Sequence, residues 1–275
     1  MKLPNAMRAV VTGAGSGLGR GFCNQIAERG GKLVVSDIDE KNAGETADIL
    51  RSRGAEAHVV KCDVSHAHEV EALAKHAEEL LGRVDLVVNN AGVATVGAVG
   101  DVPIDDWHWL LGINLYGVIY GCHAFAPRMK RQKSGHIINV ASAAGLLSAP
   151  NMGPYNVSKA GVVALSETMF TELQPFNVGV TVLCPTFFQT NILNSARDHA
   201  GDHKAKKVAA RAMERAKIDA DGVARVALDA ADAGKLHVIP QADGRWMWRL
   251  KRLAPGKFQG SLNSVEKMLV KWAAR

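Results

Sequence analysis

The stretch Thr12-Gly13-Ala14-Gly15-Ser16-Gly17-Leu18-Gly19-Arg20 decides the fold of this chain. It follows a short apolar run, residues 9–12, and leads into a segment of helical periodicity, residues 20–28. Glycines at such a junction let the backbone turn tightly and approach a pyrophosphate, while the helix offers free N–H groups to the anion. The position between a strand and a helix predicts a dinucleotide site made by Gly13, Ser16, Gly17, Leu18 and Gly19.

Seven short apolar runs are expected to form strands. They are nearly continuous rather than alternating, which is typical of parallel strands covered on both faces. They lie at residues 9–12, 33–37, 57–62, 86–89, 136–141, 178–183 and 237–239.

Longer segments with helical periodicity lie between these runs, at residues 20–28, 41–53, 67–81, 104–125, 155–174 and 220–233. Strand–helix alternation predicts an α/β fold with a doubly wound parallel sheet of Rossmann type and right-handed crossovers. We expect one catalytic domain over residues 1–242, with a substrate lid near 187–217, and a basic extension over 243–275. The uncharged run 107–127 is interpreted as a helix buried on several faces rather than a membrane span.

Composition narrows the class of protein. The chain has 275 residues, 47% of them hydrophobic, and a formal charge of +6. Of its 33 basic and 27 acidic residues, eight basic and two acidic lie from Asp243 onward, so the remaining 25 of each balance. A neutral body argues against nucleic-acid binding, which would leave a basic face on the domain itself.

Cysteine usage and the N-terminus bear on the compartment. The four cysteines lie far apart without a Cys-x-x-Cys pair, which predicts buried free thiols in a reducing compartment. No apolar signal-peptide core follows the first residues, so the expected location is cytoplasmic. We predict no metal site.

Asp37 bears on the choice of cofactor, because it ends the second predicted strand about 20 residues beyond the glycine loop. A carboxylate there accepts hydrogen bonds from the adenosine ribose hydroxyls and repels a 2′-phosphate. Ile38 follows it, and the loop residues 14–16 carry no charge. NAD is therefore favoured over NADP. Asp63, before Val64, either contacts the adenine or only caps the next helix.

Tyr155 and Lys159 form a candidate catalytic pair at the start of a predicted helix. Positions i and i+4 lie on one helix face. A phenol has a reference pKa of about 10, and a nearby ammonium and a positive nicotinamide ring would lower it. Tyr155 could then exchange a proton with a substrate hydroxyl as hydride moves.

With these motifs in order, residues 7–240 resemble the short-chain dehydrogenase/reductase family. The resemblance rests on Thr12-Gly13-x-x-x-Gly17-x-Gly19, then Asn89-Asn90-Ala91-Gly92, Asn114, Ser142 and Tyr155-x-x-x-Lys159. It implies that Tyr155 is the acid/base, that Ser142 polarises the substrate oxygen and that Lys159 bonds the nicotinamide ribose. It implies further that Asn114 holds a water linking Lys159 to solvent. By the same resemblance Asn90, Ala91, Gly92, Val64 and Pro185 contact the cofactor, and the chain forms dimers or tetramers.

One motif departs from the family pattern. After the sixth predicted strand the family usually has Pro-Gly and then Thr, whereas this chain reads Pro185-Thr186-Phe187-Phe188-Gln189-Thr190. Thr190 keeps its spacing, and the resemblance assigns it to the nicotinamide carboxamide. Thr186 puts the fine shape of the nicotinamide pocket in doubt.

The segments expected around the substrate are mostly apolar, without Arg or Lys to hold an anion. They are residues 93–96, 143–147, 150–152 and 187–193. This favours an apolar secondary alcohol or ketone, such as a steroid, a long-chain alcohol or an alicyclic ketone. The alternatives are a 3-oxoacyl-thioester reductase and, from another class, a non-catalytic nucleotide-sensing protein.

The basic extension mixes cations with large apolar residues over 245–253, and a second stretch, 265–272, has apolar residues at helical spacing. Either it lies on an anionic membrane surface as an amphipathic segment, or it contacts another subunit or the lid. Both interpretations stay open.

Overall fold

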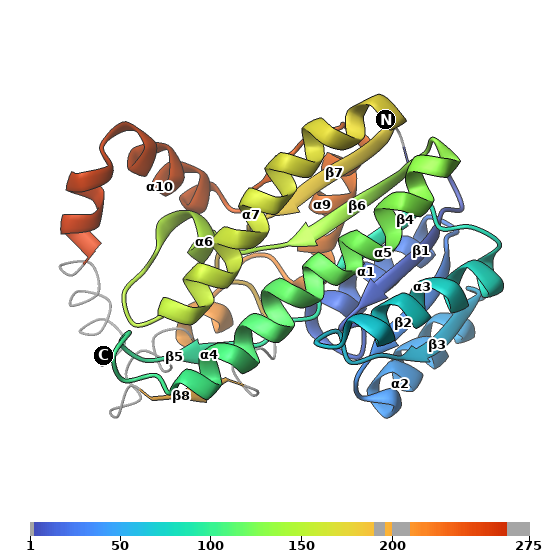
Figure 1. Ribbon diagram of the computed structural model, residues 1–275, viewed down its shortest axis with the longest axis horizontal. Helices are drawn as coiled ribbons and strands as arrows, with labels where there is room; N and C mark the ends of the chain where they lie inside the picture. Colours follow the sequence, from blue (N-terminus) through green and yellow to red (C-terminus); the bar gives the residue numbers. More distant parts are fainter. Residues whose placement is uncertain (1–2, 190–195, 200–209, 263–275) are drawn as a thin grey trace.

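A seven-stranded parallel sheet forms the centre of the molecule (Figure 1). The structure is a computed structural model and describes residues 3–189, 196–199 and 210–262. The strand order is β3-β2-β1-β4-β6-β7-β9. The strands are β1 (Arg8–Thr12), β2 (Lys32–Asp37), β3 (Ala57–Lys61), β4 (Leu86–Asn89), β6 (Gly135–Val140), β7 (Val178–Leu183) and β9 (His237–Val238). The seven predicted strands and the doubly wound parallel sheet are confirmed.

Helices cover both faces of this sheet. On one face lie α1 (Gly17–Glu28), α2 (Glu40–Ser52) and α9 (Ala220–Asp232). On the other lie α3 (Ala67–Leu81), α5 (Gly117–Gln132) and α7 (Gly153–Leu173). Because both faces are covered, the strands are apolar on both sides, which is why they read as continuous runs in the sequence.

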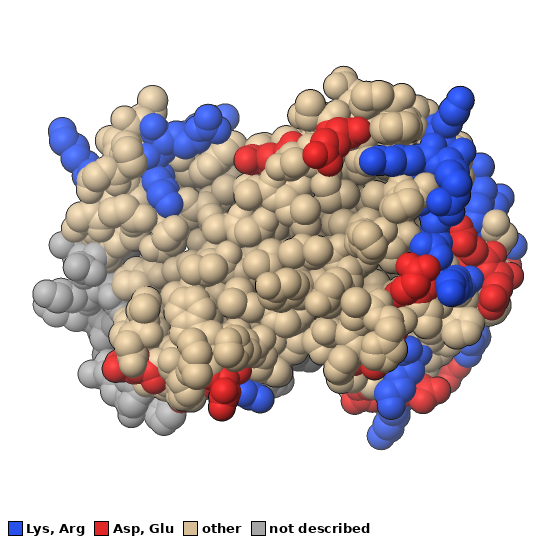
Figure 2. Space-filling model, viewed as in Figure 1, with Lys and Arg blue, Asp and Glu red and all other residues tan. Residues whose placement is uncertain are grey.

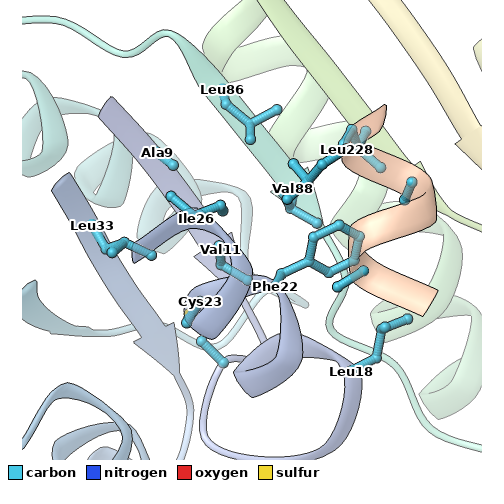
Figure 3. Close-up of a cluster of buried hydrophobic side chains, with 14 of the residues drawn as sticks. Ala9, Val11, Leu18, Phe22, Cys23, Ile26, Leu33, Leu86, Val88 and Leu228 are labelled. Carbon is cyan, nitrogen blue, oxygen red and sulfur yellow. The ribbon is translucent and has the colours of Figure 1, made fainter. Parts of the chain in front are cut away.

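The core beneath α1 shows how the first layer is fixed (Figure 3). Phe22 and Ile26 of α1 are fully buried against the sheet, and Phe22 lies on the side of Leu228 of α9. Val11 of β1 and Val88 of β4, on neighbouring strands, form the sheet side of this cluster. Burial of Phe22 holds the N-terminus of α1 against the end of β1, where the glycine loop lies. Truncating a buried Phe typically costs about 3–5 kcal/mol.

The helix expected over 104–125 differs in two respects. It consists of α4 (Ile104–Leu111), a π-helical turn η1 (Gly112–Tyr116) and α5, and it continues through Pro127 to Gln132. The predicted end was wrong because Arg128 holds the last turns. Its guanidinium pairs with Glu71 and Glu78 of α3 and donates to the Ala124 carbonyl.

The stretch 104–132 is long and apolar enough to cross a membrane by length and composition alone. In the fold its α5 part packs on α3 and on the sheet, and α4 packs on α7. This agrees with the interpretation of the uncharged run as a helix of the core.

Several short elements were not predicted. The strands β5 (Thr95–Val96) and β8 (Arg197–Asp198) pair in a separate two-stranded sheet. The helix α6 (Ala143–Leu147) follows β6, and the turn η2 (Gln174–Phe176) follows α7. The helix α10 (Ala242–Leu253) occupies the start of the basic extension. Of the expected lid, residues 187–189, 196–199 and 210–217 are described.

The four cysteines are buried free thiols, as the sequence predicts. Burial raises the pKa of Cys62, Cys122 and Cys184 to about 12. These side chains therefore pack as small apolar groups and stay protonated.

Candidate active site

The strand order reverses between β1 and β4: strands β1 to β3 extend toward one edge of the sheet, and β4 to β9 extend toward the other. Ligands of open α/β folds bind outside the carboxyl ends of the strands at this point. A cavity of about 640 Å³ lies there and extends from the glycine loop to the start of α7. It brings together these predicted cofactor residues: Gly13, Ser16, Gly17, Leu18, Asp37, Asp63, Val64, Asn90, Ala91, Gly92 and Pro185.

The glycines of the loop are required by close backbone packing. Gly13 has φ +63°, and a Cβ there would lie 2.7 Å from the Cα of Ala91. A Cβ on Gly19 would collide with the carbonyl oxygen of Gly13. Gly19 therefore keeps the loop against α1 and, unlike the other loop residues predicted to bind the cofactor, does not line the cavity. Ser16 precedes α1 without a side-chain cap, so its first amides lie open toward the cavity.

Asp37 lies at the end of β2 with its carboxylate turned toward the loop. Its Oδ2 accepts from the Gly15 amide at 2.8 Å, and its Oδ1 accepts from the Asp39 amide at 3.0 Å. Arg20 is a cation beside the same loop, but its guanidinium donates to the Gly15 carbonyl and to Thr46 Oγ1 and does not line the cavity. At the end of β2 the cavity is therefore lined by the Asp37 carboxylate and not by the Arg20 guanidinium.

Asp63 does not cap α3, because the N-cap of that helix is His66 and no side-chain cap hydrogen bond is formed there. It lines the cavity, and its Oδ1 accepts from the amide and hydroxyl of Ser65 just before α3. Burial alone would raise the pKa of Asp63, but the hydrogen bonds from Ser65 and the nearby His66 outweigh it and hold that pKa below its usual range. The side chain is fixed and ionised.

Three of the predicted catalytic side chains meet in the cavity. Ser142 lies two residues after the end of β6 and is the N-cap of α6, where its Oγ accepts from the Ala144 amide at 3.1 Å. It is also hydrogen-bonded to the Tyr155 side chain. Lys159 lies one turn along α7 from Tyr155, with Nζ 5.8 Å from the phenol ring centroid. The same Nζ donates to the Val140 carbonyl at 2.9 Å.

Burial governs the protonation of this pair. It raises the pKa of Tyr155, an effect that the hydrogen bond from Ser142 partly offsets. It lowers the pKa of Lys159 to about 8. A low-dielectric pocket disfavours charge on both groups but also strengthens any charge that a ligand brings.

Asn114 lies in the π-helical turn and is fully buried, and it does not line the cavity. Its Oδ1 accepts from the Val93 amide and its Nδ2 donates to the Val93 carbonyl, both at 2.8 Å. Nδ2 also donates to Ser158 Oγ at 3.4 Å. The side chain therefore fixes the segment after Gly92 against α7, beside Lys159.

The far part of the cavity has mainly apolar walls, from the segments that the sequence placed around a substrate. They include Val93, Ala94, Val96, Ala143, Ala144, Leu147, Pro150, Met152, Phe187 and Phe188.

Asp243 and Met247 of α10 are among the wall residues that sequence reasoning did not predict. Met213, within the expected lid, also lines the wall. The spacing of Asp243, Met247 and Lys251, four residues apart, was the available signal, since it places them on one helix face.

Thr186 contacts the start of α10 and helps to hold that helix in position. Its amide donates to Gln241 Oε1 at 3.0 Å, and its side chain contacts the start of α10. A Cβ on Gly244 would lie 2.6 Å from Thr186 Cγ2 and 2.9 Å from Ile239 Cγ2. Thr186 thus packs on α10. Thr190 lies outside the described residues.

The described residues hold no group of three or more His, Cys, Asp or Glu side chains able to bind a metal. The polar groups of the cavity are instead backbone amides, carboxylates, hydroxyls, a side-chain amide, a thiol, a phenol and an amine. A parallel sheet with this set at its switch point defines a dinucleotide-binding oxidoreductase.

Comparison with known proteins identifies the family of this chain. The model of the short chain dehydrogenase family matches residues 7–201. The chain belongs to this family, as the sequence motifs indicated, and is an oxidoreductase of it.

Two related proteins match most of this chain but different fractions of their own length. A "CLA biosynthesis dehydrogenase/reductase" from Lactiplantibacillus plantarum is 37% identical over 67% of this chain and 66% of its own length. The "Probable oxidoreductase EphD" of Mycobacterium tuberculosis is 39% identical over 73% of this chain. The match spans only 34% of that longer protein.

A solved structure agrees over nearly the whole chain. It is a short chain dehydrogenase/reductase from Burkholderia phymatum in complex with NAD, 38% identical, with a TM-score of 0.87. The alignment covers 92% of this chain and 95% of that one.

Proposed function

We propose that this protein is an NAD-dependent oxidoreductase that interconverts a secondary alcohol and a ketone on an apolar substrate. One observation carries the proposal: Ser142, Tyr155 and Lys159 line the same cavity as the glycine loop and Asp37. With NAD bound, a hydride donor or acceptor and a proton donor or acceptor would thereby lie beside one substrate site. The NAD-bound relative from Burkholderia phymatum supports the cofactor.

The residues of the cavity fit NAD. The open amides of the loop and of the first turn of α1 suit its pyrophosphate. Asp37 suits the ribose hydroxyls and opposes a 2′-phosphate. Asp63 and Val64 would hold the adenine, and Asn90, Ala91, Gly92 and Pro185 the nicotinamide half. Thr190 is proposed for the carboxamide by sequence position alone. When bound, NAD supplies the acceptor of the hydride.

The side chains then divide the proton chemistry. Ser142 donates to the substrate oxygen and holds it beside the Tyr155 hydroxyl. As phenolate, Tyr155 takes the hydroxyl proton while the carbon loses its hydride, and in reduction it returns that proton. Lys159 would stabilise the phenolate by its charge and bond the nicotinamide ribose. Asn114 acts as a positioning residue through Val93.

The wall of the cavity supports the substrate class. Apolar side chains surround the part of the cavity beyond Tyr155, and Asp243 of α10 adds a negative charge to the lining. A carboxylate or phosphate on the substrate would find repulsion there. This favours an uncharged lipid-like, steroid or alicyclic alcohol over small hydroxy acids.

The remaining alternatives predict different behaviour. A 3-oxoacyl-thioester reductase would prefer NADP, which Asp37 disfavours. A non-catalytic nucleotide sensor would not need Ser142, Tyr155 and Lys159 together in one cavity.

The experiment is an assay of NADH formation across secondary alcohols from small hydroxy acids to steroids, in parallel with NADP. We expect turnover with NAD on apolar alcohols. Tyr155→Phe should lower kcat at least about 10³-fold, because the proton acceptor is lost. It should leave the Kd for NADH within about twofold, since the phenol hydroxyl is not needed for pyrophosphate binding. Normal activity of this variant would refute the mechanism.

Self-association is proposed as well, as a homodimer or homotetramer. Tyr116 and Val157, on the outer faces of η1 and α7, are each 50% exposed. Large apolar groups exposed on two helices side by side suit a subunit contact. Light scattering should show a dimer or tetramer, and Val157→Glu should shift it to smaller species.

A further inference from the structure

The inner face of α10 is fixed against the catalytic domain. Met247 lines the cavity, and Lys251 Nζ donates to the Leu146 carbonyl at 2.8 Å and to Ser148 Oγ at 3.3 Å. The Trp248 ring lies 5.4 Å from the ring of His237. These contacts from two successive turns determine which side of α10 faces outward.

The outer face carries a stripe of large apolar side chains. Trp246, Leu250 and Leu253 follow one another at i, i+4 and i+7, so they share one side of the helix. Leu253 is 84% exposed and Trp246 65% exposed. Such exposure of adjacent large apolar groups marks an interaction surface.

A row of arginines runs beside this stripe at the same spacing: Arg245, Arg249 and Arg252. Arg245 donates to the Ile239 and Pro240 carbonyls, and Arg252 stacks on the Trp248 ring. Within the described part of the chain, no carboxylate forms an ion pair with any of the three. Figure 2 shows basic side chains without acidic neighbours at the α10 end of the molecule.

We propose that the outer face of α10 attaches the protein to an anionic phospholipid surface. Exposed Trp and Leu side chains beside unpaired cations are the pattern of a helix that lies in the membrane interface, with its apolar side inserted and its cations at the phosphates. Pairing with a second copy through this face would bring two uncompensated arginine rows together. A negatively charged lipid is the partner that complements both the arginine row and the apolar stripe.

The same helix is a wall of the substrate cavity. If the proposed function holds, an apolar substrate dissolved in the membrane would reach the cavity beside α10 without crossing bulk water. This step rests on the proposed function, whereas attachment of α10 does not.

The test is co-sedimentation of the full chain with vesicles of phosphatidylglycerol, compared with vesicles of phosphatidylcholine alone. We expect binding to the former, weakened by high salt. Arg249→Glu should lower the partition coefficient about tenfold or more, since it reverses one charge at the surface. The double variant Leu250→Ser/Leu253→Ser should lower it by a similar factor. Trp246 emission should shift to the blue on binding, and that shift should vanish in Trp246→Phe.

Matched controls lie at the opposite end of the long axis in Figure 1, on α2 and α3. Arg53→Glu and Leu80→Ser change an exposed cation and an exposed leucine there and should bind like the original chain. Equal binding by the α10 variants would overturn the proposal, and so would a change of oligomeric state in them without lipid. Binding is measured without turnover, so it stands or fails separately from the enzymatic proposal.

Discussion

At the scale of single residues, Tyr155 and Lys159 lie in surroundings that oppose the charges that the proposed mechanism requires. Burial raises the pKa of Tyr155 and lowers that of Lys159 to about 8. A phenolate forms more readily when positive charge enters the same low-dielectric space. Under the proposed function, proton transfer would therefore be favoured in the complex with a positively charged nicotinamide rather than in the free protein.

Asp37 yields a prediction about cofactor choice. Replacing it with Ser, together with Ile38→Arg, removes the carboxylate and supplies a cation at the ribose end. The ratio of kcat/KM for NADP over NAD should rise by about two orders of magnitude, because a like charge is removed and an opposite one added. Steady-state kinetics with both cofactors measures it. Ile38→Leu serves as the control and should leave the ratio unchanged.

Asp243 yields a prediction about substrate charge. Asp243→Asn keeps the size of the side chain and removes the negative charge from the cavity wall. The kcat/KM for substrates carrying a carboxylate should rise about fivefold or more relative to uncharged analogues. Competition assays with matched acid and amide substrates measure it. An unchanged ratio would show that Asp243 does not face the substrate.

At the scale of elements, α10 and the segments that follow β6 and β7 form one unit. Thr186 packs on Gly244, and Lys251 holds the turn after α6 through Leu146 and Ser148. The position of α10 thus fixes two walls of the cavity at once. The π-helical turn acts similarly, because it aims Asn114 at the Val93 backbone.

Gly244→Ala tests this coupling. The added methyl would lie 2.6 Å from Thr186 Cγ2, so α10 must shift. We expect a loss of about 1–3 kcal/mol in the free energy of unfolding and a raised KM for apolar substrates. The Kd for NADH should stay within about twofold, because the glycine loop lies on other elements. The double variant Gly244→Ala/Thr186→Gly should recover part of the lost stability, because only the contact with Ile239 remains, and no recovery at all would contradict the contact with Thr186.

At the scale of the whole molecule, stability depends on a histidine in the core. His136 of β6 is buried, and its Nε2 lies 2.9 Å from Thr181 Oγ1. Because that hydroxyl donates to the Lys235 carbonyl, the histidine must donate from Nε2, which leaves Nδ1 an unpaired acceptor. Burial lowers the pKa of His136 to about 3. Protonation would bury a charge without a partner.

The sign of the resulting pH dependence follows from linkage. Below the reference pKa of about 6.5 the unfolded chain binds a proton that the folded chain refuses, so stability falls as the pH falls from 6.5 toward 3. At pH 5 the loss from this group is about 2 kcal/mol. Urea unfolding at pH 7 and pH 5 measures it. His136→Gln should lose less over this interval, and equal losses in both proteins would assign the effect elsewhere.

The sequence by itself determined the sheet and much of the site. The strand runs, the glycine loop, Asp37 and the pair Tyr155/Lys159 are local signals, because each depends on backbone conformation or helix spacing within a few residues. Ser142 was also expected at a strand end, and strand ends of a parallel sheet meet at one edge. Their gathering in one cavity follows from that geometry.

Only the tertiary structure decided the rest. The helix that continues through Pro127 depends on Arg128 pairing with α3, a contact about 50 residues away in the chain. Asn114 proved to be bonded to Val93, and Asp243 and Met247 reached the cavity only because α10 folds back over Thr186. Such contacts join segments whose separation carries no periodic signal, so packing rather than local propensity determines them.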